Sequence, residues 1–152
     1  MDKAKLLNFL IKARAKTYAG SGGKVSPTFP GSTQLEHKEG NWFYRDLYNL
    51  GNSIFMGLET VYFKNKPAWS MCYYGNFKGI TEKEADEILR KALIENKDTT
   101  RLWHKVEWRK DNFYYVCTPD GPGSIDEMMG LEEIYKGKKK VYFFYYAGGF
   151  IG

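Results

Sequence analysis

An internal repeat is the feature that most constrains how this chain can fold. Residues 57–75 read GLETVYFKNKPAWSMCYYG, and residues 130–148 read GLEEIYKGKKKVYFFYYAG. With a constant offset of 73 residues and no gaps, seven of the nineteen positions are identical: Gly57/Gly130, Leu58/Leu131, Glu59/Glu132, Tyr62/Tyr135, Lys66/Lys139, Tyr73/Tyr146 and Gly75/Gly148. Self-similarity of this kind indicates that one supersecondary unit occurs twice.

Each copy of the repeat has the pattern of a β-hairpin. Two runs rich in aromatic and β-branched residues flank a polar break at residues 64–67 or 136–140. Such runs favour strands, and the break favours a turn between antiparallel neighbours. Side-chain alternation gathers the large residues of each second run on one face, which we expect to be core: Trp69, Met71, Tyr73, Tyr142, Phe144 and Tyr146.

The opposite face of the second run differs between the copies. It carries small residues in the first copy (Ala68, Ser70 and Cys72) and larger ones in the second (Val141, Phe143 and Tyr145). Small side chains leave room that an aromatic residue of the other copy can wall. We therefore expect a concave, aromatic-lined gap between the repeats, with complete filling by side chains as the alternative.

Two amphipathic helices are predicted, one before each set of strands. Asp2 can cap a helix that runs to about residue 16, with an apolar stripe of Leu6, Leu7, Leu10 and Ile11. Residues 81–84 read TEKE, a capping box that opens a second helix to about residue 96 with Ile88, Leu89, Ala92 and Leu93 inward.

Further strands are expected at residues 41–50, 103–108 and 112–118. The predicted fold is α+β, with two helices packed on antiparallel sheet in a pseudo-twofold duplication of a helix–strands–hairpin unit. We expect one domain, residues 1–152, whose repeated units cover about residues 2–79 and 80–152.

The composition is that of an ordinary globular domain, with 43% hydrophobic and 27% charged residues. No N-terminal run has the length or cleavage pattern of a signal peptide, so we expect a cytoplasmic protein without a membrane partner. The net charge of +5 raises the question of nucleic-acid binding. Four of the basic residues fall in one expected turn, residues 136–140, which explains the excess without a polyanion.

No common catalytic or metal-binding motif occurs in the sequence, and no cofactor or metal is expected. Cys72 and Cys117 are interpreted as buried free thiols, and His37 and His104 as surface or structural residues. Glu59 and Glu132 each share a strand face with an apolar residue, where an unpaired carboxylate is costly. Each glutamate needs a partner, which could be a strand cation such as Arg45 or a ligand donor.

Two other segments contain candidate binding residues. Residues 17–31 form a long glycine-containing loop whose backbone N–H groups, with Lys24, could approach an anion, although the phosphate-loop spacing is absent and a flexible connection is the alternative. Tyr44, Arg45 and Asp46 combine a stacking surface, a forked cation and an acceptor.

Four segments resemble an uncharacterised bacterial domain family that occurs alone or behind helix-turn-helix domains of the xenobiotic-response-element type. They are TYAGSGG (17–23), GNWFYRD (40–46), KPAWSMCYYG (66–75) and VYFFYYAGGFI (141–151). This chain departs from similar sequences at Cys72, where they often have Asn, and at Ala147, where they have His. The resemblance implies a sensor and carries no activity, and the doubled arrangement is similar to gyrase-inhibitor-like domains, whose ligands lie between the repeats.

The sequence therefore predicts a non-catalytic domain that binds a small, nucleotide-like anionic ligand, such as a nucleotide messenger, by sequestration or sensing. One alternative is a hydrolase or lyase that uses Glu59 and a histidine, and a second is single-stranded nucleic-acid binding on the aromatic sheet face. Self-association into a homo-oligomer is left open. The expected ligand contacts are Tyr18, Lys24, Trp42, Tyr44, Arg45, Asp46, Glu59, Trp69, Tyr74, Glu132 and Tyr145.

Overall fold

The computed structural model describes all of residues 1–152 as two helices and nine strands. In chain order they are α1 (Lys3–Lys16), β1 (Lys24–Val25), β2 (Thr33–Glu39), β3 (Trp42–Gly51), β4 (Ile54–Phe63), β5 (Lys66–Asn76), α2 (Glu82–Glu95), β6 (Val106–Lys110), β7 (Phe113–Pro119), β8 (Met128–Lys136) and β9 (Lys139–Phe150). The predicted α+β class is confirmed.

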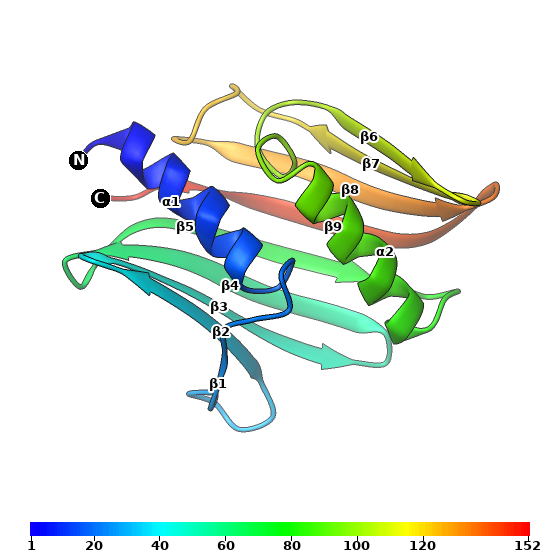
Figure 1. Ribbon diagram of the computed structural model, residues 1–152, viewed down its shortest axis with the longest axis horizontal. Helices are drawn as coiled ribbons and strands as arrows, with labels where there is room; N and C mark the ends of the chain where they lie inside the picture. The colour runs from blue at the N-terminus through cyan, green and yellow to red at the C-terminus, as the bar shows by residue number, and fades with distance from the viewer.

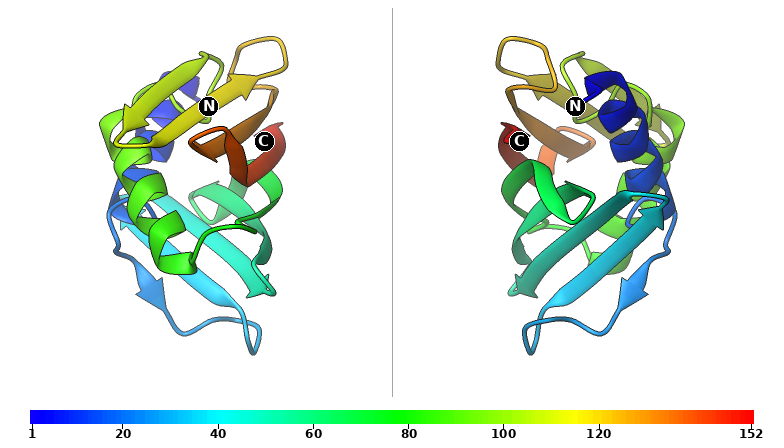
Figure 2. Two further views of the ribbon diagram at one scale, coloured as in Figure 1. Left: turned by 90° about the vertical axis from the view of Figure 1, so that its right-hand side faces the viewer. Right: turned by 90° about the vertical axis from the view of Figure 1, so that its left-hand side faces the viewer.

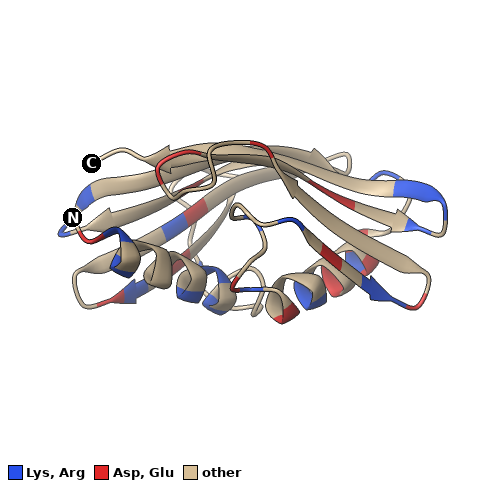
Figure 3. Cartoon of the chain, turned by 90° about the horizontal axis from the view of Figure 1, so that it is seen from above, with Lys and Arg blue, Asp and Glu red and all other residues tan.

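All nine strands form one antiparallel sheet in the order β1-β2-β3-β4-β5-β9-β8-β7-β6. Both helices lie on the same face of this sheet (Figures 1 and 2). Seen from above, the sheet arches over the helical layer, and no helix covers its other face (Figure 3). Neither helix is long and apolar enough to cross a membrane.

The centre of the sheet is the pairing of β5 with β9, in which Tyr73 lies opposite Tyr146. Each of these strands ends a meander that follows one helix, with five strands after α1 and four after α2. The hairpins β4–β5 and β8–β9 also share their register. Glu59 pairs with Met71 as Glu132 pairs with Phe144, and both hairpins shift register at the same point of the repeat. The two predicted hairpins are thus confirmed.

Both helices begin where their capping residues predict. The Asp2 side chain accepts hydrogen bonds from the backbone N–H groups of Ala4 and Lys5, and both bonds of the capping box between Thr81 and Glu84 are present. The inward face of α2 is as predicted. On α1 the buried face is rotated slightly from the predicted stripe and consists of Leu6, Phe9, Leu10 and Ala13.

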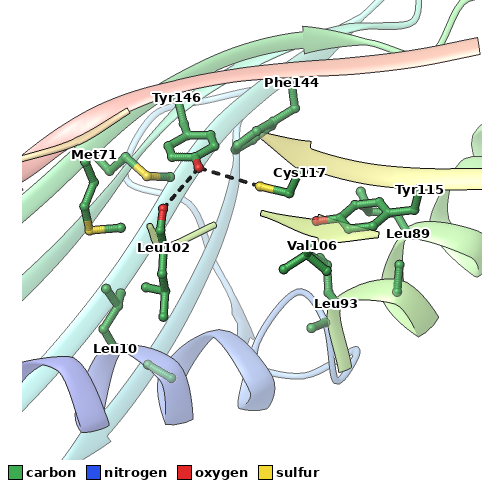
Figure 4. Packing of buried hydrophobic residues seen from close by; sticks show 14 of the residues in the cluster. Leu10, Met71, Leu89, Leu93, Leu102, Val106, Tyr115, Cys117, Phe144 and Tyr146 are labelled. Carbon is green, nitrogen blue, oxygen red and sulfur yellow. Dashed lines mark hydrogen bonds between the residues drawn. The ribbon is translucent and has the colours of Figure 1, made fainter. Parts of the chain in front are cut away.

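The hydrophobic core fills the space between the helices and the sheet. Figure 4 shows Leu10, Leu89 and Leu93 of the helices beside aromatic and sulfur-containing side chains of the strands. The predicted core face of β5 and β9 is buried, except that Tyr73 is half-buried. Burial of this apolar layer is the main favourable contribution to folding.

Four expectations about the strands and thiols were wrong. Strands β1 and β2 were missed because β2, TQLEHKE, is rich in polar residues, as suits a strand near an exposed edge. Residues 103–105 are not strand, since β6 begins at Val106. The register shifts turn Ala68 and Val141 into the interior, away from the open face. Cys72 is exposed on that open face, whereas Cys117 is buried as expected.

A glycine substitution tests the close packing of the hairpin on its neighbours. A Cβ atom at Gly57 would lie 2.5 Å from the Tyr73 hydroxyl oxygen and 2.6 Å from the Tyr48 Cβ. We expect Gly57→Ala to lower the free energy of unfolding by about 1–3 kcal/mol, measured by urea denaturation, because the core is overpacked. Gly51→Ala is the matched control, since nothing lies within 4 Å of its added Cβ. Equal stability of the two variants would contradict the packing described.

Candidate functional site

Two buried glutamates tie the helical side of the molecule to the sheet. The fully buried Glu132 carboxylate receives Arg101 in a bidentate pair, at 2.9 and 2.7 Å, and also accepts from the Tyr115 hydroxyl at 2.5 Å and the Tyr142 hydroxyl at 2.7 Å. Each oxygen of this carboxylate thus accepts two hydrogen bonds, as a buried charge requires.

The Glu59 carboxylate is held by the other cation of the interior, Arg14 of α1. Arg14 donates to Glu59 Oε2 from Nη2 at 2.6 Å and from Nε at 3.0 Å. Its Nη1 also donates to the backbone carbonyl of Arg101 at 3.1 Å, which connects the two ion pairs. The partner of Glu59 is therefore a helix residue, and the expectation of Arg45 was wrong because Arg45 lies on the opposite face of β3 and donates to the Tyr62 hydroxyl.

Asp46 is a third buried carboxylate, and it has no cation of its own. Its exposed fraction is 5%, and it lies directly opposite Glu59 across the β3–β4 pairing. The Tyr73 hydroxyl donates to its Oδ1 at 2.6 Å, and no donor reaches Oδ2. Two arginines therefore face three carboxylates in the interior.

The environment of Asp46 changes its proton affinity. Burial, followed by the negative charge of Glu59, raises the pKa of Asp46 to about 7, although the hydrogen bond from Tyr73 and the charges of Arg101 and Arg14 act in the opposite direction. Burial and then Asp46 raise the pKa of Tyr73 well above its ordinary value, so Tyr73 remains a donor. Asp46 is thus the titratable group of this site near neutral pH.

A cavity of about 90 Å³ lies between α2 and the sheet, and Asp46 is in its lining. Seven of its fifteen lining residues are aromatic: Tyr18, Tyr48, Phe55, Tyr73, Phe77, Tyr142 and Phe144. Four others are acidic, and Arg101 is the only base. Leu50 and Glu82 are exposed, which places the cavity's opening at these residues. A smaller space of about 30 Å³ adjoins it and shares Tyr18, Asp46, Glu59 and Arg101.

A second concave region is a groove of about 1470 Å³ across the open face of the sheet. Its centre lies at the β5–β9 pairing, where Tyr74 is opposite Tyr145 and Cys72 is opposite Ala147. Methionine and leucine from the same repeat positions line it on both sides: Met56, Leu58, Met129 and Leu131. Asp120 and Glu133 lie in its lining, and no lysine or arginine does.

The structure divides the predicted site residues between several places. Tyr18, Asp46 and Glu59 line the α2 cavity, and Tyr44 lines the smaller space beside it. The remaining residues lie elsewhere: Glu132 in the buried ion pair, Tyr74 and Tyr145 in the open-face groove, Trp69 fully buried below the Arg14 guanidinium, Trp42 against Phe9 and Phe63, Arg45 against Tyr62, and Lys24 exposed on the edge strand β1. The eleven residues therefore do not form one site.

Part of the backbone of the glycine-containing loop is engaged within the loop itself. The N–H groups of Ser21 and Gly22 bond to the carbonyls of Tyr18 and Thr17. An added Cβ at Gly22 would lie 2.5 Å from the carbonyl oxygen of Lys16, so this glycine serves the close turn after α1.

Several cavity residues were missed from the sequence. In the sequence, nothing distinguishes Phe55, Phe77 and Tyr142 from other core aromatic residues. Arg101 lies in a turn, and no local pattern indicates that it pairs with the distant Glu132. The buried repeat glutamates were the one available signal, because each requires a cation from somewhere else in the chain.

Removal of one buried cation tests the ion pairs. We expect Arg101→Met to lower the free energy of unfolding by about 3–5 kcal/mol, because Glu132 is left charged and uncompensated. A second change, Glu132→Gln, in the same chain should restore part of this loss in denaturant unfolding. The control is Arg109→Met, since Arg109 is exposed and its loss should cost less than about 1 kcal/mol.

The pH dependence of stability tests Asp46. Because its folded pKa of about 7 exceeds the unfolded value of about 3.8, the folded state binds the proton more tightly. This stabilisation is complete below the unfolded pKa and is lost as the pH rises through the folded pKa, a change on the order of 4 kcal/mol. We expect the Asp46→Asn variant to lack this loss, so that its stability relative to the parent chain rises between about pH 4 and 7. A constant difference across that range would contradict a protonated Asp46.

Comparison with known proteins identifies a family but no characterised relative. No curated protein and no solved structure matches the chain. The family model described as "Domain of unknown function (DUF5680)" matches residues 46–151, which includes Asp46, both repeat hairpins and α2. Since this match covers more than half of the sequence, the chain belongs to the DUF5680 family.

Proposed function

We propose that this chain is a non-catalytic ligand-binding domain whose small-molecule ligand occupies the cavity between α2 and the sheet. The observation that carries the proposal is the convergence of buried polar groups, Asp46 above all, in a cavity with aromatic walls. Ligand sites typically combine apolar walls with a few placed polar groups, and a carboxylate of perturbed pKa is a common mark of them.

The contacts of Glu59 favour binding over catalysis. The enzyme alternative requires Glu59 to work with a histidine, but Glu59 Oε2 is engaged by Arg14 and no histidine lines the cavity. A carboxylate held by a guanidinium in this way is placed as a structural anchor. The cavity also lacks a cysteine, serine or lysine that could act as a nucleophile.

The charges of the cavity disfavour the nucleotide-like anionic ligand, and those of the open-face groove disfavour single-stranded nucleic acid. Acidic residues outnumber Arg101 in the cavity, and Arg101 is already paired with Glu132. The volume of about 90 Å³ is about three times the liquid volume of one water, which is small for a nucleotide. The open-face groove has Asp120 and Glu133 but no basic lining residue, whereas single-strand binding uses basic grooves.

The repeat supports a duplicated origin for the binding domain. The two hairpins share one register and one bulge position, and the β5–β9 pairing is centred on Tyr73 and Tyr146, which are equivalent in the repeat. We include the pseudo-twofold duplication of the helix–strands–hairpin unit in the proposal. A ligand-binding half-site could then differ between the copies, since Asp46 has no acidic counterpart at Cys117.

Sensing or sequestration is the biological role that such a domain would serve. The resemblance to a bacterial family found behind helix-turn-helix domains supports sensing, and a chain that binds its ligand alone would sequester it. A cytoplasmic location belongs to the same proposal and rests on the sequence.

A ligand screen that maps each hit onto the protein tests this function. We expect thermal-shift hits from a library of small molecules to perturb amide resonances of α2 and of β3–β5 around Asp46. Ala85→Phe fills the cavity from the buried face of α2 and should weaken such hits by at least about tenfold.

The matched control is Tyr145→Ala, which changes a large side chain on the opposite face of the sheet and should leave affinity unchanged. If Ala85→Phe is too unstable to test, the resonance map of the parent chain decides alone. Hits that perturb only the open-face groove, or a library without a single hit in the cavity, would refute the proposal.

A further inference from the structure

We infer that the cavity under α2 takes the ammonium head group of a small organic cation, with the Asp46 carboxylate as its counter-ion. This inference rests on the proposed function, since it names the ligand class of the same cavity. Three features of the cavity support it: the aromatic residues of its walls, the Asp46 carboxylate that has no cation, and its volume.

The walls of the cavity are of the kind that attracts a cation. The ring of Phe55 stacks on Tyr142 and Phe144 at centroid distances of 5.9 and 6.1 Å, and Tyr73 stacks on Phe144 at 5.0 Å. The faces of such rings carry negative potential, and aromatic cages recognise quaternary ammonium groups. One cation already uses this surface, because the Arg101 guanidinium lies 4.1 Å from the centroid of Phe144.

Asp46 is the buried carboxylate that has no cation partner. Glu132 is neutralised by Arg101 and Glu59 by Arg14, while Asp46 has a hydrogen bond from Tyr73 and no cation. A buried carboxylate without a cation must either bind a proton or attract another positive group. Its unbonded Oδ2 belongs to a residue that is 95% buried and lines the cavity.

None of the other ionisable groups around the cavity replaces Asp46 as the counter-ion. On α2, Asp86 accepts from the Tyr18 hydroxyl at 2.6 Å and pairs with Arg90 at 3.4 Å, and Glu82 is exposed at the opening. On the strands, Tyr44 and Tyr48 have pKa values raised first by burial, so both are neutral donors. No lysine lines the cavity.

Protons and the organic cation compete for the same carboxylate. Because the pKa of Asp46 lies at about 7, the ligand must displace a proton at lower pH, and its affinity should fall about tenfold per pH unit there. Binding should release nearly one proton at about pH 6 and almost none at about pH 8.5. A cavity of about 90 Å³, about three times the liquid volume of one water, takes a small ammonium head group with the rest of the ligand at the opening.

Choline and its uncharged carbon isostere, 3,3-dimethylbutan-1-ol, provide the test. We expect choline to bind at least about tenfold more tightly than the isostere at about pH 8, as measured by calorimetry, with resonance shifts at the cavity. Titrations at about pH 6 in buffers of different ionisation enthalpy measure the released protons. Asp46→Asn should bring choline down to the affinity of the isostere and abolish the proton release, and the control Asp120→Asn, on the open face, should keep both.

The outcomes separate this inference from the proposed function. If library ligands bind in the cavity but choline binds no better than the isostere, or binds without proton release, the ammonium site is refuted and the binding domain stands. Failure of choline to shift cavity resonances at up to about 10 mM has the same meaning. Proton release from the parent chain decides the question if Asp46→Asn does not fold.

Discussion

The buried pairs Glu132–Arg101 and Glu59–Arg14 are the constraint on which the interior depends. Each carboxylate projects from a strand next to the centre of the sheet, and each guanidinium comes from the helical side: Arg14 from α1, Arg101 from the turn after α2. Pairs of this kind add little to stability compared with apolar packing, but an unpaired member is severely destabilising. The helices therefore have few alternative positions on the sheet, and the space that remains between α2 and the strands has a defined shape.

The two halves use this framework differently. Asp46 lies opposite Glu59 and bonds to Tyr73, and Cys117 lies opposite Glu132 with its sulfur 3.6 Å from the Tyr146 hydroxyl. A carboxylate in one half thus corresponds to a neutral thiol in the other, whose pKa burial raises further. The Tyr146 hydroxyl also donates to the backbone carbonyl oxygen of Leu102 at 3.3 Å, as Figure 4 shows. Residues of both halves line the cavity, but its uncompensated negative charge comes from the first half alone.

The sequence predicted the parts of this fold that depend on local pattern. The hairpins, the helix caps and the burial of the large face of β5 and β9 follow from alternation, turn residues and capping chemistry, all of which act over a few residues. The sequence also marked Glu59 as a buried acid in need of a partner. The sequence did not identify Arg14 as that partner, because Arg14 is 45 residues from Glu59 and nothing distinguishes it from other basic residues in the last turn of a helix. Asp46 shows the same limit, since the absence of a cation around it is a property of the assembled interior.

The position of the β5–β9 pairing has a consequence for how the chain folds. Every other strand pairing joins neighbours in sequence, whereas Tyr73 and Tyr146 are separated by 73 residues. Closing so long a loop costs conformational entropy before any new contact compensates for it, and topologies rich in distant pairings fold slowly. The meanders on either side can form from local contacts alone. We expect this pairing to be the slowest to form, and until it forms the inner edges of β5 and β9 present an unsatisfied row of backbone groups to any other chain nearby.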